Sequence, residues 1–254
     1  MNTDLITLLA DRLRDETEIH RAKVFPYQLM TAYKNCSAEI PHAIREALQD
    51  AMEIATANVP KIPGRVAVCI DVSSSMGWSI TGWRASATST VRCIDVAALI
   101  TSCILRKNPN TTVISFNHDS QKIILNPRDS VLTNAEKLAE LLGGGTNCGA
   151  AMRYLAKQET TPDVVIFVSD NESWLGSNCG DTEAFRYWKR ILTKNPSAKL
   201  INIDIQPYGT TQTPDCASIA NVGGFSDVIF DFIHNFVTTP TAQHWVETIE
   251  SITL

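Results

Sequence analysis

The chain has 254 residues, with 22 basic and 27 acidic side chains and a formal net charge of −5. Hydrophobic residues make up 44% and charged residues 19%, which is typical of a globular protein and excludes a disordered or fibrous one. No apolar stretch reaches 18 residues, and the amphipathic, acidic start MNTDLITLLADRLRDE does not fit a signal peptide, so we expect neither a membrane span nor a membrane partner. The mild acidity removes any simple electrostatic argument for nucleic-acid binding.

The seven cysteines contain no C-x-x-C pair. Their spacing argues against a zinc site built from paired cysteines and against a disulfide framework. We therefore expect reduced, mostly buried thiols in a cytoplasmic protein. The cysteines are Cys36, Cys69, Cys93, Cys103, Cys148, Cys179 and Cys216.

Residues 1–60 predict a helical segment. An apolar stripe with helical spacing begins near the N-terminus, and Pro26 and Pro41 suit the first turns of two further helices. The stripe consists of Leu5, Leu8, Leu9 and Leu13. We expect it to pack against the core or against other helices. The tract NVPKIPG, residues 58–64, ends this segment with two prolines and a glycine.

From residue 61 onward, buried strand patterns alternate with helical ones. This alternation predicts a second domain over residues 61–254, with a doubly wound, mostly parallel α/β sheet and an antiparallel hairpin at its edge. The expected strands are residues 66–70, 111–116, 121–125, 164–168 and 198–205. The expected helices are residues 90–108, 134–142, 146–157, 182–195 and 226–237.

Two of the buried strands end in aspartate, Asp71 and Asp170, and parallel sheets place functional loops at these carboxyl ends. Ser73 and Ser75 follow Asp71 at alternate positions, and Thr146 follows a run of three glycines. These are hard oxygen donors, which Mg²⁺ prefers. The pattern predicts a Mg²⁺ or Mn²⁺ site with an open position that a carboxylate or phosphate of a partner can take.

Other interpretations of these residues are weaker. Asp71 and Asp170 can merely cap turns or helices, but five matching residues in three loops make a coincidence improbable. Glu172 is an alternative to Asp170 as the ligand from the third loop. The sequence lacks both a phosphate-binding G-x-x-x-x-G-K-[ST] loop and a G-x-S-x-G nucleophile elbow, so we expect no enzyme and no small-molecule substrate. His118, in the hairpin loop, is expected to be merely solvated.

Aromatic residues surround the predicted metal site in the sequence. Trp78 and Trp83 follow the first loop, and Trp174 lies four residues after Asp170. Together with Glu172 they are candidates for partner contacts, by stacking on a base or gripping a side chain. The alternative for Trp78 and Trp83 is packing over the sheet edge.

The motif Asp71-x-Ser73-x-Ser75, with Thr146 and Asp170, resembles the metal-ion-dependent adhesion site (MIDAS) of von Willebrand factor A (vWA) domains over residues 62–254. The resemblance implies that these five residues hold a divalent cation from three loops. In that family the third-loop aspartate often acts through water or a hydrogen bond to another ligand.

Several longer tracts are more specific. NVPKIPGRVAVCIDVSSSM, GGGTNCGAAM, SDNESWLG and GGFSDVIFDFIHNF resemble the C-terminal part of TROVE-type Ro ribonucleoproteins. AKVFPYQLMTAYK, within residues 1–60, resembles the end of their helical-repeat module. The family binds small Y RNAs through a ring of such repeats, most of which is absent here, so no RNA-contact residue is carried over.

This resemblance implies a metal-dependent binding module of a Ro-type ribonucleoprotein involved with small, structured Y-like RNA. The alternative is an adaptor that recruits a protein by bridging its acidic residue through the cation, without binding RNA itself.

Overall fold

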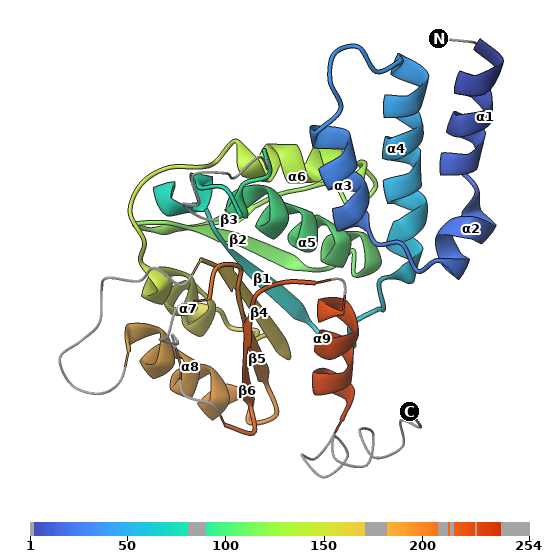
Figure 1. Cartoon of the computed structure of the whole chain (residues 1–254). Helices are drawn as coiled ribbons and strands as arrows, with labels where there is room; N and C mark the ends of the chain where they lie inside the picture. The colour runs from blue at the N-terminus through green and yellow to red at the C-terminus, as the bar shows by residue number, and fades with distance from the viewer. Residues whose placement is uncertain are drawn as a thin grey trace.

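The computed structural model describes residues 3–80, 90–170, 182–207, 213, 216–226 and 228–239. It places short N-terminal helices beside a six-stranded sheet that carries helices on both faces (Figure 1). The predicted doubly wound α/β architecture is therefore confirmed. None of the helices in these ranges has the length and apolar character needed to cross a membrane.

The N-terminal segment is helical, as predicted. It consists of α1 (Thr3–Leu13), α2 (Glu16–Arg21), α3 (Pro26–Lys34), α4 (His42–Ala55) and the 3₁₀ turn η1 (Thr56–Asn58). Pro26 lies in the first turn of α3, where its missing N–H costs no hydrogen bond. Ala47, Ala51 and Ala55 recur along one buried face of α4, so this face packs closely against its neighbours.

Most of the leucine stripe of α1 is not buried as predicted. Leu5, Leu8 and Leu9 are exposed, Leu8 to 64%, whereas the small Ala10 is buried. The prediction that this stripe packs inside the molecule is wrong for these three side chains, because helical spacing fixes a common face but not what covers it.

The strands appear close to the predicted positions. They are β1 (Val66–Asp71), β2 (Thr112–Phe116), β3 (Ser120–Ile123), β4 (Val164–Ser169), β5 (Lys199–Asp204) and β6 (Ile219–Gly223). Their order across the sheet is β3-β2-β1-β4-β5-β6, and β3 pairs antiparallel with β2 at one edge, as the hairpin predicted. The opposite edge strand, β6, was not predicted; its sequence IANVG is short and only partly buried.

Two apolar clusters lie on opposite faces of the sheet. One face is covered by α5 (Cys93–Lys107), α6 (Val131–Ala139), α9 (Ile229–Thr238) and the N-terminal helices. The other is covered by α7 (Cys148–Lys157) and α8 (Glu183–Lys194). Helix α6 begins three residues before its predicted start, because the Ser130 hydroxyl accepts a hydrogen bond from the Thr133 amide and caps the helix. Helices α5 and α9 each begin three residues after their predicted starts.

Aromatic contacts connect the two ends of the described chain. Tyr27 of α3 meets Phe225 edge to face with ring centroids 4.7 Å apart, and Phe25 stacks on Phe230 of α9 at 6.1 Å. The N-terminal helices are thus packed against the sheet unit, and one hydrophobic cluster includes residues of both.

Candidate metal centre

The candidate site lies where the strand order reverses. β1 has β2 on one side and β4 on the other; α5, which follows β1, covers one face, while α8, which follows β4, covers the opposite face. Open α/β sheets bind ligands at the carboxyl ends of strands at such a switch point. Asp71 is the last residue of β1, and Asp170 directly follows β4.

Asp71 is fully buried and held by uncharged donors. One carboxylate oxygen accepts a hydrogen bond from the Ser73 amide at 2.8 Å, and the other accepts one from the Ser169 hydroxyl, also at 2.8 Å. The hydroxyls of Ser73 and Ser75 lie 3.1 Å apart. The first predicted loop therefore brings Asp71, Ser73 and Ser75 together.

The electrostatics of Asp71 are unfavourable for an isolated carboxylate. Burial raises its pKa to about 7, and the nearby charge of Asp170 adds to the shift, although hydrogen bonds from Ser73 and Ser169 oppose it. Within the described residues, Asp71 forms no ion pair. A cation at this place would supply the missing positive charge.

The glycine loop is tied to the first loop by its backbone. The Ser74 amide donates to the Gly144 carbonyl at 2.9 Å, and the Gly143 amide donates to the Val72 carbonyl at 2.7 Å. Gly144 has φ +84°, in the left-handed region that glycine adopts without strain. This pairing holds the loop that carries Thr146 next to the Asp71 loop, just before α7 begins.

His118 has a structural role that the sequence did not predict. Its Nε2 accepts a hydrogen bond from the Gly145 amide at 2.9 Å. The expectation that His118 is merely solvated is wrong: its exposed ring supports the glycine loop from the side of the β2–β3 hairpin.

Two further polar residues, Ser169 and Asp204, lie at the carboxyl ends of the strands beside Asp71. Asp71, Ser169 and Asp204 end β1, β4 and β5, and Asp204 is paired in register with Ser169. Asp204 is buried, and burial together with the charge of Asp170 raises its pKa to about 7. The signal was present in the sequence, since the third buried strand also carries an aspartate near its end, but the following Ile205 made the strand seem to continue.

The donor set fits a hard cation only if hydroxyls take part. Among the described residues, no three His, Cys, Asp or Glu side chains are grouped so that they can hold a metal ion. The residues that do converge offer carboxylate and hydroxyl oxygens, the donors that Mg²⁺ prefers, with water completing its shell. The five-residue ligand set stays a prediction.

The predicted aromatic rim is described only at one position. Trp78, at the end of the 3₁₀ turn η2 (Ser74–Gly77), is 51% exposed, so it does not pack fully over the sheet edge. Trp83, Glu172 and Trp174 lie outside the described residues.

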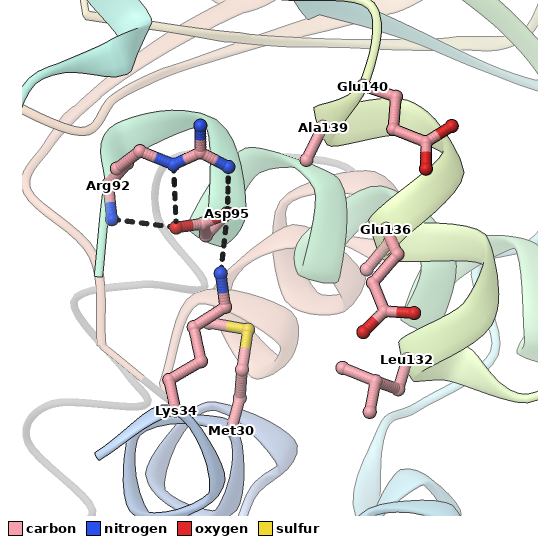
Figure 2. A pocket seen from close by; sticks show the side chains of 9 residues that line it. Met30, Lys34, Arg92, Asp95, Leu132, Glu136, Ala139 and Glu140 are labelled. Carbon is pink, nitrogen blue, oxygen red and sulfur yellow. Dashed lines mark hydrogen bonds and ion pairs between the residues drawn. The ribbon is translucent and has the colours of Figure 1, made fainter. Parts of the chain in front are cut away.

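A separate cavity of about 360 Å³ lies between α3, α5 and α6. Figure 2 shows that Lys34 of α3 and Arg92 reach the same carboxylate, that of Asp95 near the start of α5. Lys34 Nζ lies 2.7 Å and Arg92 Nη2 lies 2.9 Å from Asp95 Oδ1. This cluster joins the N-terminal helices to the sheet unit.

Comparison with known proteins finds relatives over most of the chain. The family model described as the Ro60 vWA domain matches residues 65–237. A protein named RNA-binding protein RO60 from Deinococcus radiodurans is 23% identical over 231 residues, which covers 87% of this chain and 42% of that protein. Its namesake from Caenorhabditis elegans is 23% identical over 241 residues, covering 91% of this chain and 36% of that protein.

The fold is also found in a solved structure. The crystal structure of the Deinococcus radiodurans RO (RSR) protein superposes with a TM-score of 0.75 at 18% identity, covering 94% of this chain and 49% of that one. The chain thus spans about half, or less, of the length of the relatives it matches.

Proposed function

Because the chain belongs to the Ro60 vWA domain family, we propose that it is the metal-dependent binding module of a Ro-type ribonucleoprotein involved with small, structured Y-like RNA. In this proposal the chain binds and does not catalyse. Asp71, Ser73, Ser75, Thr146 and Asp170 hold Mg²⁺ or Mn²⁺, either directly or through water. The observation that carries the proposal is the buried Asp71 carboxylate at the switch point, which has two uncharged hydrogen-bond donors and no ion pair among the described residues.

A cation at this place would compensate buried negative charge. A buried carboxylate is costly unless it is paired with a positive charge or coordinates a metal. Asp71 and Asp170 lie close enough for the charge of one to raise the pKa of the other. A bound divalent cation would relieve this repulsion, and an oxygen of a partner's phosphate or carboxylate would complete its coordination.

The role with RNA is supported by the two relatives, both named as RNA-binding proteins. A cytoplasmic setting is part of the proposal, and the free thiols of the described cysteines fit a reducing compartment.

The metal site is tested by melting the protein in increasing Mg²⁺ or Mn²⁺. A ligand that binds only the folded state raises the melting temperature, by an amount equivalent to about 2.7 kcal/mol at a hundred times its Kd. We expect the rise in the wild type and in Asp129→Asn, a control at a half-buried carboxylate just before α6, and we expect Asp71→Asn to lose it. An unchanged melting temperature in the wild type would contradict the site.

The RNA role is tested by electrophoretic shift with a small structured RNA at low salt. We expect a shifted complex whose affinity falls steeply as salt is added, because phosphate contacts release counterions. Absence of any shift at low salt would contradict this role for the chain.

The adaptor remains the second candidate because the net charge of −5 does not favour RNA over the chain as a whole. In that function an acidic side chain of a protein partner takes the open position on the cation. It predicts a pull-down that needs Mg²⁺ and is lost in Asp71→Asn, and binding retained in EDTA would count against it.

A further inference from the structure

Helix α8 concentrates positive charge on a chain that is acidic overall. Within Glu183–Lys194 there are four basic side chains and a single acidic one, whereas the whole chain carries −5. Ala184, Trp188 and Ile191 are buried and anchor the opposite side of the helix against the sheet. Arg186, Lys189 and Arg190 are all exposed, and we call these three residues the α8 cationic face.

Aromatic rings support two of these cations. Lys189 Nζ lies 4.5 Å from the ring centroid of Phe185, and the guanidinium of Arg190 lies 5.1 Å from that of Tyr187. Such contacts hold a long side chain near one conformation, so less rotamer entropy is lost when it binds an anion.

The arginines are not neutralised by acidic neighbours. Neither Arg186 nor Arg190 forms an ion pair with any residue in the described part of the chain. Lys194, by contrast, donates to the carbonyls of Ala156 and Gln158 at 2.9 Å each and closes the end of α7. Lys194 is therefore structural and is left out of the cationic face.

The net acidity of the chain does not cancel this local charge. At about 0.1 M salt the Debye length is about 10 Å, so exposed charges further away are largely screened. A ligand at α8 would be attracted mainly by the residues it meets there.

We propose that the α8 cationic face binds the phosphate backbone of RNA. This inference rests on the proposed role with RNA but not on the cation. Arg186 and Arg190 are four residues apart, which places them about 6 Å apart along the helix axis on one side of it, and the planar guanidinium matches the oxygens of a phosphate in two parallel hydrogen bonds.

The chemistry of the face favours a nucleic acid over a protein. The structure describes α8 in full, and none of its large apolar side chains is exposed. A protein partner would find little apolar surface to bury there, whereas interfaces with nucleic acids are polar and strongly positive.

The experiment compares two variants with the same change in charge. The first carries Arg186→Gln, Lys189→Gln and Arg190→Gln. The control carries Lys61→Gln, Lys122→Gln and Arg128→Gln, three exposed basic residues outside α8. Binding of a labelled single-stranded RNA oligonucleotide of mixed sequence is followed by fluorescence anisotropy over a range of salt, with and without EDTA. Melting curves confirm that both variants fold.

We expect the α8 variant to lose about tenfold or more in affinity and its salt dependence to become shallower by about 2, because three phosphate contacts at about 0.7 each are lost. The control should bind like the wild type, and EDTA should not abolish the difference between the variants.

The outcomes separate this inference from the proposed function. Equal binding by the two variants would overturn the inference and leave the RNA role standing. A wild-type chain that binds no RNA at low salt would overturn the RNA role itself. Competition by polyglutamate or by anionic vesicles as strong as that by unlabelled RNA would show a site for acidic proteins or membranes and would also overturn the inference.

Discussion

Asp95 is held by two cations from different parts of the chain. Lys34 comes from α3 and Arg92 from the residue that caps α5, and both lie within 2.9 Å of the same oxygen (Figure 2). Burial acts to raise the pKa of Asp95, but the hydrogen bonds from Arg92 and Lys34 outweigh it and leave the pKa below its ordinary value of 3.8. The folded protein therefore binds this proton less readily than the unfolded chain does.

The sign of the pH effect follows from this lowered pKa. The stabilisation is fully present above about pH 4 and is lost as pH falls through the lower folded value. We expect Asp95→Asn to lower the free energy of unfolding at pH 7 by about 1.5–3 kcal/mol, the range for hydrogen bonds to charged groups. Urea unfolding at pH 7 and pH 3 should show a smaller difference between variant and wild type at pH 3; an equal difference at both would contradict the linkage.

At Gly64, just before β1, the backbone lies close to the side chain of Asp163. Its φ is +84°, and a Cβ there would lie 2.9 Å from Asp163 Cβ, while Asp163 itself is fixed by hydrogen bonds from the Arg65 backbone and side chain. We expect Gly64→Ala to lower the free energy of unfolding by about 1–3 kcal/mol through strain and crowding. Chemical denaturation measures this loss, and a variant as stable as the wild type would show that the turn can relax.

At the scale of residues, the sequence predicted the strand-end aspartates because parallel strands must bring their carboxyl ends to one edge. It did not show the hydrogen bond from Ser169 to Asp71, nor the support of Gly145 by His118. Both contacts join residues far apart in the chain, and no local pattern encodes their pairing.

At the scale of elements, α8 is anchored by Trp188. This side chain is fully buried in the apolar cluster that α7 and α8 form with one face of the sheet. Its indole Nε1 has no hydrogen-bond partner among the described residues. We expect Trp188→Ala to cost about 3–5 kcal/mol through the cavity it leaves. Trp188→Phe should cost markedly less, because it keeps most of the ring and removes a buried N–H that has no partner. Urea unfolding of both variants checks the order, and an equal loss would contradict it.

The buried strands β1 and β4 were predictable because each is a continuous apolar run covered on both faces, and β5 because its run is mostly apolar and is interrupted only by Asn202. β6 was missed because its pairing with β5, rather than its own composition, makes it a strand. Helix α1 shows a similar limit. The spacing of its leucines predicts a helix, but the exposed Leu5, Leu8 and Leu9 show that spacing does not predict which element, if any, covers them.

At the scale of the whole molecule, one apolar cluster extends from the N-terminal helices to α9. Because this cluster is shared, we expect the protein to unfold in a single cooperative transition. Tryptophan fluorescence and far-ultraviolet circular dichroism should give the same midpoint in urea. Two separated transitions would indicate that the N-terminal helices melt on their own. The division of the chain at residue 60 stays a prediction, since packing continues across it.

The two faces of the sheet differ in the number of helical layers that cover them. The face with α5, α6 and α9 receives a further layer from the N-terminal helices of the same chain, whereas α7 and α8 form the outer layer of the other face in the described structure. A ligand bound to α8 would therefore be separated by the full thickness of the sheet from the N-terminal helices, which pack on the opposite face. Binding on α8 would leave the packing of the N-terminal helices on the other face undisturbed.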